Sequence, residues 1–246
     1  MDLKTYLDST YLKTAEQAGL SDLENEKIVI NTINEAIVER FKLVMIRPQY
    51  VLMAKQMIQE ANSNLDVGTV ISFPEGTNSL PQKLDEAQVA IDNGADDLDF
   101  VINYQAYKRG EINMVKNEIL ECTRLAIGSN KIIKWIIETA ALTNDEIIKI
   151  CVLIKNTVMS NFTEHVYQFI YIKSSTGFYV TKNDIPNGAT IDTIVLMLEN
   201  GSPLPIKASG GVNNYDTAAT LIQLGVKRIG TSAARLITTG GANMEY

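Results

Sequence analysis

The segment FIYIKSSTG at residues 169–177 combines a short apolar run with a lysine and a turn of small residues. The same order recurs in LPIKASGG at residues 204–211, so Lys173 and Lys207 each close a strand-like run and open a glycine-containing turn. A lysine held in a dry interior can become a nucleophile, because burial favours its neutral amine. Two ammonium groups about 4 Å apart repel by roughly 4 kcal/mol at an effective dielectric constant of 20, so one lysine could keep the other uncharged.

Strand-like and helix-like segments alternate along the 246 residues. The expected strands are 5–8, 42–46, 68–72, 97–102, 132–138, 168–173, 204–208 and 228–230, and the expected helices are 24–39, 51–62, 80–93, 111–126, 143–155, 191–200 and 215–224. This alternation predicts an α/β protein with parallel strands, and eight units in about 250 residues favour one (β/α)8 TIM barrel spanning residues 1–246 as a single domain. An open doubly wound sheet is the alternative, but no Gly-x-Gly-x-x-Gly follows the first strand.

Side-chain alternation along the strands indicates which residues face the barrel interior. In residues 97–102 the apolar side chains share one face, which places Asp97 and Asp99 on the other. The same reasoning places these charged residues inside the barrel: Asp99, Lys134, Glu138, Lys173 and Lys207. Buried charges must be paired or functional. We therefore expect a catalytic centre around Lys173, Lys207 and Asp99, whereas Lys134 and Glu138 fit a structural salt-bridge network equally well.

Glycine-containing turns follow the last three expected strands, at residues 174–177, 209–211 and 230–233. Glycine lets backbone N–H groups approach an anion closely, and barrels often bind phosphate in the loops after strands seven and eight. We expect a phosphate site there, although each turn taken singly is also explained by conformation alone. The polar segment 179–188 forms a loop on the same face, and the tail from about residue 238 is Gly-rich and expected to be flexible.

Composition excludes several function classes. The net charge of −7 argues against a nucleic-acid partner, and no apolar run reaches the length of a membrane span. Cys122 and Cys151 lack metal-like spacing and suit a cytoplasmic protein, as does a start without a signal-peptide core. The single histidine, His165, argues against a multi-histidine metal site and against a Ser/His/Asp triad.

Six segments in order resemble the deoxyribose-phosphate aldolases, which are class I, Schiff-base-forming aldolases with a (β/α)8 barrel. The segments are TVISFPEG (69–76), GADDLDFVIN (94–103), IIETAALT (136–143), IKSSTGF (172–178), IKASGGV (206–212) and RIGTS (228–232). The resemblance implies a lyase of deoxyribose phosphate catabolism that reversibly cleaves 2-deoxy-D-ribose 5-phosphate into D-glyceraldehyde 3-phosphate and acetaldehyde. It also implies that no cofactor and no metal take part.

The resemblance assigns roles residue by residue. Lys173 matches the Schiff-base lysine, Lys207 the second lysine that lowers the pKa of the first, and Asp99 the aspartate of the proton relay. The positions that match phosphate-binding or other substrate-binding residues are Thr176, Gly177, Gly210, Gly211, Ser232, Asp8 and Thr10, with Asp8 and Thr10 expected near the substrate hydroxyl groups.

The chain also departs from the family pattern. Met45 stands where cysteine is usual, and Arg47 stands where asparagine or tyrosine is common. The alternation of side chains along the strand points both of these side chains inward, so Arg47 could pair with Asp8 or Glu75, or touch substrate. These departures and the long segment 179–188 leave open a lysine-dependent aldolase for another phosphorylated aldehyde or ketose, and a non-catalytic sugar-phosphate-binding barrel is a further alternative. We expect a homo-oligomer, with a dimer as the first candidate. We also consider Tyr246 as a lid that covers the bound phosphate.

Overall fold

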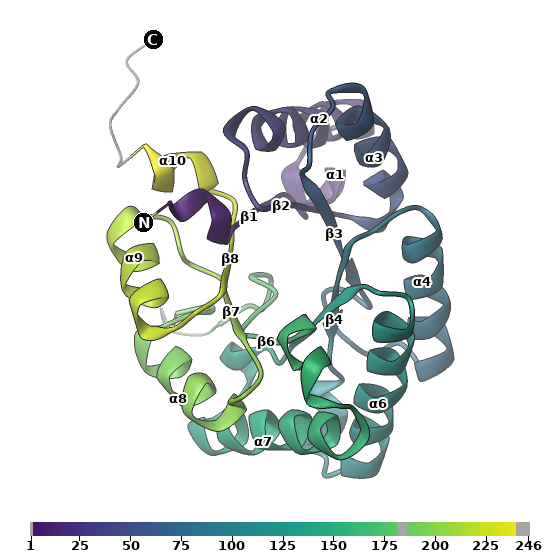
Figure 1. The fold of residues 1–246 in the computed structure, drawn as a ribbon, viewed down its shortest axis with the longest axis vertical. Helices are drawn as coiled ribbons and strands as arrows, with labels where there is room; N and C mark the ends of the chain where they lie inside the picture. Colours follow the sequence, from purple (N-terminus) through teal and green to yellow (C-terminus); the bar gives the residue numbers. More distant parts are fainter. Residues whose placement is uncertain (1, 182–185, 240–246) are drawn as a thin grey trace.

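Eight parallel strands form a closed barrel in chain order, with the helices outside it (Figure 1). This structure is a computed structural model and describes residues 2–181 and 186–239. The strands are β1 Leu7–Thr10, β2 Leu43–Ile46, β3 Asp66–Ile71, β4 Asp97–Val101, β5 Ile132–Ile136, β6 Ile170–Lys173, β7 Ile206–Ser209 and β8 Arg228–Thr231. The barrel closes because β1 pairs with β8 as well as with β2. The (β/α)8 prediction is confirmed, and an open sheet is excluded.

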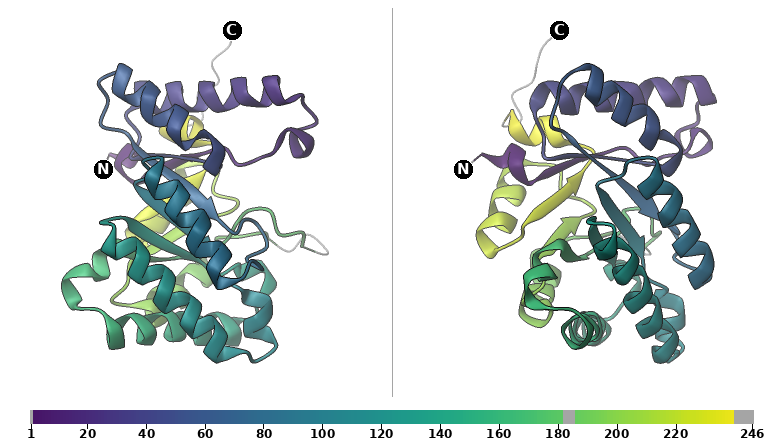
Figure 2. Two further views of the ribbon diagram at one scale, coloured as in Figure 1. Left: turned by 90° about the vertical axis from the view of Figure 1, so that its right-hand side faces the viewer. Right: turned by 45° about the vertical axis from the view of Figure 1, so that its right-hand side comes forward.

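Helices wrap the outside of the barrel (Figure 2). They are α1 Ala15–Ala18, α2 Asp22–Glu39, α3 Val51–Glu60, α4 Leu80–Asp92, α5 Tyr104–Lys108, α6 Ile112–Gly128, α7 Asn144–Asn161, α8 Ile191–Gly201, α9 Tyr215–Leu224 and α10 Ala234–Thr238. Short 3-10 helices occupy Leu3–Tyr6, Pro48–Tyr50, Thr139–Ala141 and Glu164–Phe169. Reciprocal capping starts α2 and α7, whereas α6 begins without a side-chain cap. At α7, Thr143 accepts from the N–H of Glu146, whose carboxylate accepts from the N–H of Thr143. Among the described residues, none of these helices has both the length and the hydropathy to cross a bilayer.

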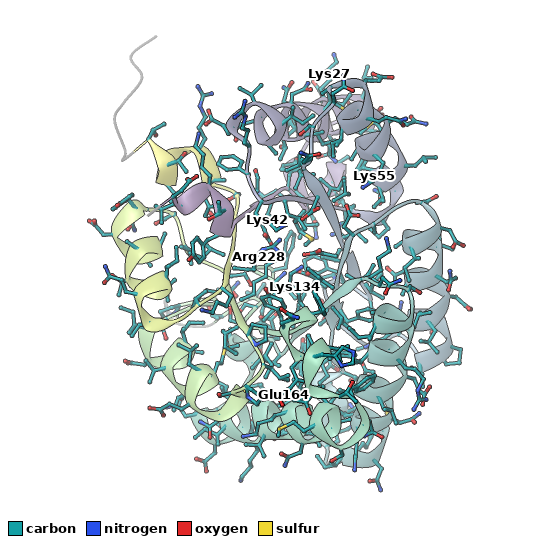
Figure 3. The ribbon with its side chains drawn as sticks, in the orientation of Figure 1. Lys27, Lys42, Lys55, Lys134, Glu164 and Arg228 are labelled. Atoms are coloured by element: carbon teal, nitrogen blue, oxygen red, sulfur yellow. The ribbon has the colours of Figure 1, made fainter. Side chains whose placement is uncertain are left out.

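The two faces of the barrel wall differ in chemistry. The outward face is apolar and packs on the helices, as where Phe100 of β4 lies 5.4 Å from Trp135 of β5, centroid to centroid. The interior is divided: beside β2 and β3 it is apolar, with Leu43, Met45 and Val70 in one buried cluster. Beside β4, β5, β6, β7, β8 and β1 it is charged. Figure 3 shows Lys134 and Arg228 in the middle of the barrel.

Several predicted boundaries were wrong for local reasons. The first strand was expected at 5–8 but runs from Leu7 to Thr10, because the hydroxyl of Thr5 donates to the carbonyl of Asp2 in a 3-10 turn. The strand expected from residue 168 starts at Ile170, because Phe169 ends another 3-10 helix and is 41% exposed. The strand expected to reach Glu138 ends at Ile136, because the Glu138 backbone is left-handed with φ +57°. The short helices α1, α5 and α10 were not predicted.

The carboxyl ends of the strands meet at one end of the barrel. In the left view of Figure 2, the segment after β1 with α1 and the segment after β6 project from this same end. α10 ends at Thr238, and the tail expected from about residue 238 falls almost wholly on residues outside the described part of the chain. Residues 240–246, and with them the lid assigned to Tyr246, lie outside the described residues.

Candidate active site

A single carboxylate connects three lysines inside the barrel. One oxygen of Asp99, Oδ2, lies 2.8 Å from Nζ of Lys173 and 2.9 Å from Nζ of Lys207. The other oxygen, Oδ1, accepts from Nζ of Lys134 at 2.8 Å. Because Lys173 and Lys207 share one oxygen, their nitrogens lie no more than 5.7 Å apart, the sum of 2.8 and 2.9 Å. The structure thus brings together the three residues expected at the catalytic centre and adds Lys134.

The strand register explains this meeting. Lys173 of β6 is directly opposite Lys207 of β7, and Asp99 of β4 is opposite Lys134 of β5. The side chains of Lys173 and Lys207 are 3% and 0% exposed, and that of Asp99 is 0% exposed. Both lysines end their apolar runs at the carboxyl side of the barrel, where barrel enzymes place their chemistry.

Burial and neighbouring charge together set the protonation of this group. Burial lowers the pKa of Lys173 to about 8, and the positive charge of Lys207 adds to this effect while Asp99 opposes it. Burial also opposes ionisation of Asp99, but Lys134, Lys173 and Lys207 outweigh it and hold the pKa of that carboxyl well below its usual range. For Lys134 the two carboxylates beside it outweigh burial and raise its pKa. Lys173 is therefore more easily deprotonated than Lys134.

A second layer of charge surrounds this centre. Asp8 of β1 is fully buried, and its Oδ2 lies 2.6 Å from Nζ of Lys207, an ion-pair contact without hydrogen-bond geometry. Its Oδ1 lies 2.6 Å from a guanidinium nitrogen of Arg228 on β8, which also reaches Asp97 at 3.3 Å. Asp8 was expected near substrate hydroxyl groups, and here it contacts two cations. Sequence reasoning did not single out Arg228, because it begins a predicted strand of only three residues, 228–230.

Glu138 and Thr176 form a separate contact at the rim. The left-handed backbone of Glu138 turns its carboxylate toward the strand-six turn, where it accepts from the N–H of Thr176 at 3.3 Å and also from its hydroxyl. Burial raises the pKa of Glu138, and the hydrogen bonds from Thr176 oppose this. Glu138 makes no ion pair with the residues described, so it does not belong to the lysine cluster.

The three expected phosphate turns lie side by side after β6, β7 and β8. Gly177, Gly210 and Gly211 have φ of +81°, +88° and +78°, a region that favours glycine. Two serines join the first two turns, since Ser174 donates to the carbonyl of Ser209 at 2.8 Å and the Ser209 hydroxyl donates to the carbonyl of Ser175 at 2.6 Å. Ser232 follows β8 and is exposed. These turns would meet an anion with backbone groups, because none of them contains a lysine.

The segment after β6 rests on the second of these turns. The N–H of Ala189 donates to the carbonyl of Gly210 at 3.0 Å. A Cβ at Gly210 would lie 2.6 Å from the carbonyl oxygen of Asn187, so this contact requires glycine. Tyr179, from the same segment, makes an edge contact with Tyr104 at 6.4 Å. The described part of the 179–188 segment is therefore packed against the barrel mouth.

Met45 of β2 and Arg47, which follows β2, lie on the apolar side of the barrel mouth. Met45 is fully buried among apolar neighbours. Arg47 pairs with neither Asp8 nor Glu75 among the described ion pairs; its Nε donates to the carbonyl of Leu12 at 2.8 Å, and its guanidinium carbon lies 5.0 Å from the ring centroid of Phe73. That ring meets Phe178 at 5.1 Å in an edge contact. The interpretation of Arg47 as the partner of Asp8 is wrong, because Lys207 and Arg228 already occupy that carboxylate. The hydroxyl of Thr10 donates to the carbonyl of Asp8 at 2.8 Å.

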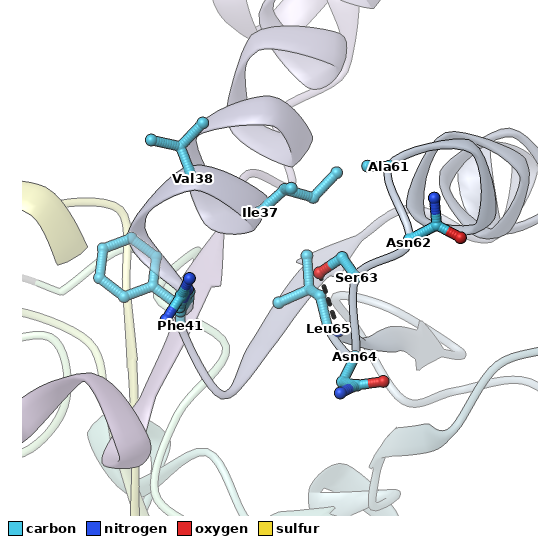
Figure 4. Close-up of a pocket in the computed structure, with 9 residues that line it drawn as sticks. Ile37, Val38, Phe41, Ala61, Asn62, Ser63, Asn64 and Leu65 are labelled. Carbon is cyan, nitrogen blue, oxygen red and sulfur yellow. Dashed lines mark hydrogen bonds between the residues drawn. The ribbon is translucent and has the colours of Figure 1, made fainter.

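One cavity formed by described residues lies away from these lysines. It has a volume of about 590 Å³ and lies between the end of α2 and the segment after α3, where β2 and β3 begin (Figure 4). Its lining residues are Ile37, Val38, Arg40, Phe41, Ala61, Asn62, Ser63, Asn64 and Leu65. This is the amino-terminal end of the barrel, which stabilises such folds rather than carrying chemistry.

Comparison with known proteins decides the family. The DeoC/LacD family of aldolases matches residues 5–228. The chain belongs to this family. A deoxyribose-phosphate aldolase of Thermococcus gammatolerans is 35% identical over 246 residues, covering 100% of this chain and 99% of the relative, and one of Lactococcus lactis subsp. lactis is 37% identical over 241 residues, covering 98% and 97%. The solved deoxyribose-phosphate aldolase of Aeropyrum pernix, described as a tetramer, superposes with a TM-score of 0.77 at 25% identity, covering 97% of this aldolase and 90% of that chain.

Proposed function

We propose that this aldolase reversibly cleaves 2-deoxy-D-ribose 5-phosphate into D-glyceraldehyde 3-phosphate and acetaldehyde through a Schiff base on Lys173. The observation that carries the proposal is the position of Lys173, a buried amine with a pKa of about 8 held 2.8 Å from Asp99. At pH 7 roughly a tenth of such an amine is unprotonated, whereas a solvated lysine is less than about a thousandth unprotonated. The relatives named above and the family itself support the same substrate and reaction.

In the synthetic direction, Nζ of Lys173 attacks the carbonyl carbon of acetaldehyde, and the adduct loses water to give an iminium ion. The positive nitrogen acidifies the neighbouring methyl group. Asp99, Lys207 and a water relay this proton away, and the electron pair left behind forms an enamine. The enamine carbon then attacks the aldehyde carbon of glyceraldehyde 3-phosphate, whose oxygen takes up a proton. Water hydrolyses the product iminium and frees Lys173; cleavage is the reverse sequence.

Asp99 suits this sequence because it contacts both lysines through one oxygen. Its negative charge can stabilise the iminium nitrogen when Lys173 becomes cationic, since preorganised opposite charge acts strongly at a water-poor site. The ammonium of Lys207, 2.9 Å from the same oxygen, can donate a proton during enamine formation, and the neutral amine that this leaves can accept one back. These steps use amine and carboxylate chemistry alone, so the proposal includes no cofactor and no metal.

The phosphate of the substrate would sit at the turns after β6, β7 and β8. Backbone N–H groups at Gly177, Gly210 and Gly211, with the exposed hydroxyl of Ser232, are the proposed donors. Thr176 supports the first turn through Glu138. Asp8 and Thr10 are proposed near the substrate hydroxyl groups, with Asp8 acting from beside Lys207.

The test is cleavage of 2-deoxy-D-ribose 5-phosphate, followed through both products, with Lys173→Ala as the control. We expect the variant to lose several orders of magnitude in kcat, because the covalent route disappears. A panel of other phosphorylated aldehydes and ketoses at equal concentration tests the substrate, given Arg47 at the mouth. Binding of the sugar phosphate without cleavage, and without a borohydride-reducible adduct, would favour a non-catalytic barrel and contradict the proposal.

We also propose a homodimer in the cytoplasm. The compartment is supported by Cys122 and Cys151, which are both unpaired and buried. Large apolar side chains on the outer helices support self-association, among them Val38, 77% exposed, and Val89, 58% exposed. Light scattering coupled to gel filtration measures the assembly; a monomer or a tetramer at micromolar concentration would contradict the dimer.

A further inference from the structure

Six buried charges form a closed ring of alternating sign inside the barrel. Lys134 contacts Asp97 at 2.6 Å and Asp99 at 2.8 Å. Lys207 continues the ring from Asp99 at 2.9 Å to Asp8 at 2.6 Å. The ring closes through one guanidinium, because Arg228 lies 2.6 Å from Asp8 and 3.3 Å from Asp97. Every member is at most 4% exposed.

Lys173 stands outside this ring. Each of the three ring cations contacts two carboxylates, whereas Lys173 contacts Asp99 alone among the described ion pairs. The ring contains three carboxylates and three cations, so its charges balance without Lys173. A protonated Lys173 would be a fourth cation in a water-poor interior, where an uncompensated charge is costly.

We propose that Arg228 is a positioning residue for the reaction: by closing the ring it neutralises the three carboxylates without Lys173, which leaves the nucleophile as the surplus cation that gives up its proton. The inference rests on the proposed role of Lys173. Arg228 acts through Asp8 and Asp97 and does not touch Lys173. From β8 its guanidinium, which is permanently charged, reaches both carboxylates.

Charged and titratable groups from several strands surround Lys173. They are Asp97 and Asp99 of β4, Lys134 of β5, Glu138 of the following turn, Tyr171 of β6, Lys207 of β7, Asp8 of β1 and Arg228 of β8. Glu138 interacts electrostatically with Lys173, but burial raises the pKa of its carboxyl, which bonds to Thr176 and forms no ion pair in the described structure. Burial raises the pKa of Tyr171, so its phenol stays neutral over the working range. The ring therefore determines the charge balance.

Charge balance predicts opposite effects for two substitutions. Arg228→Met leaves three carboxylates with two cations, so Lys173 becomes the third cation and holds its proton more tightly. Asp97→Asn leaves two carboxylates with three cations, so Lys173 gives up its proton more easily. The double variant has two carboxylates and two cations and restores the balance. A unit charge about 10 Å away shifts a pKa by about one unit at an effective dielectric constant of 20.

The experiment measures how fast Lys173 forms a reducible imine at each pH. Acetaldehyde and sodium cyanoborohydride are added to the full chain between pH 6 and pH 10, and peptide mass spectrometry quantifies the two-carbon adduct on Lys173. We expect a midpoint near pH 8 for the native chain. The midpoint should rise by about one pH unit in Arg228→Met, fall by about one in Asp97→Asn and return in the double variant. Arg228→Lys, which keeps the charge, should stay close to the native midpoint.

Equal midpoints in all variants, or shifts of the same sign in the two single variants, would overturn the inference while leaving the Schiff base intact. If Arg228→Met does not fold by circular dichroism, Asp97→Asn alone decides, because a midpoint that stays or rises contradicts the ring. An adduct on another lysine in the native chain would overturn the proposed function and this inference with it. A purely structural role for Arg228 predicts lower stability without opposite shifts.

Discussion

Replacing Lys173 by methionine should make the protein more stable near neutral pH, although it removes the proposed nucleophile. The amine is 3% exposed, and burial lowers its pKa from 10.5 to about 8. A pKa that is lower in the folded state means that the fold disfavours the ammonium. Methionine keeps the apolar stem without the charge, and Asp99 keeps Lys134 and Lys207 as partners.

The size of this effect follows from the two pKa values. Their difference is 10.5 − 8, or 2.5 units, which corresponds to about 3 kcal/mol. The destabilisation by the ammonium is complete below pH 8, shrinks as the pH rises from 8 to 10.5, and vanishes above 10.5 because Lys173 is then neutral in both states. At pH 7 we expect Lys173→Met to unfold with a free energy about 3 kcal/mol higher than the native chain, and at pH 10 with less than about 1 kcal/mol of advantage.

Urea titration monitored by circular dichroism at pH 7 and pH 10 measures both differences. Lys134→Met is the matched control, since Lys134 is equally buried but contacts two carboxylates that raise its pKa. That variant should lose stability, by roughly 3 kcal/mol or more, because it leaves buried carboxylates short of a partner. A Lys173→Met protein less stable than the native chain at pH 7 would refute the reasoning that burial of its ammonium is unfavourable.

Further predictions concern the reaction and the loops around it. The value of kcat/KM for cleavage should rise with pH and level off above about 8, where Lys173 is neutral; a profile that is flat from pH 6 to 9 would count against this. Asp99→Asn should lower kcat by about two orders of magnitude or more in the same cleavage assay, because the proton relay is lost. Gly210→Ala should raise KM for the phosphorylated substrate, since its Cβ would meet the Asn187 carbonyl at 2.6 Å, and should leave trapping of acetaldehyde nearly unchanged. Arg47→Leu should lower the free energy of unfolding by about 1–3 kcal/mol in urea titrations, because a loop carbonyl loses its donor.

Periodicity predicted the barrel and much of the candidate site. Strand alternation placed Asp99, Lys134, Lys173 and Lys207 inside, and the structure places all four there. Alternation is reliable for these residues because their strands carry an uninterrupted apolar face. The start of a helix was also close where its capping residue is strong, as at Thr143 before α7, whereas α7 ends at Asn161 and not at 155. The 3-10 turns were not predicted, since they depend on local hydrogen bonds such as that between Thr5 and Asp2.

The ring could not be read from the sequence. Its closing contact joins Arg228 to Asp8, which are 220 positions apart, and depends on the register of β1 against β8. The expected first strand was shifted by two residues, and the last was only three residues long, too short for parity to decide the direction of Arg228. Repulsion from Lys207 was the expected cause of a neutral Lys173. Burial has the larger effect, and burial is a property of the folded barrel that spacing does not give.

The uncharged amine of Lys173 is tested most directly by nuclear magnetic resonance of the chain labelled with nitrogen-15 at lysine Nζ. The Lys173 signal is assigned by its loss in Lys173→Met and followed from pH 6 to pH 11. The structure predicts a titration midpoint near pH 8 for Lys173. A midpoint at or above 10.5, the value of an ordinary lysine, would contradict the account.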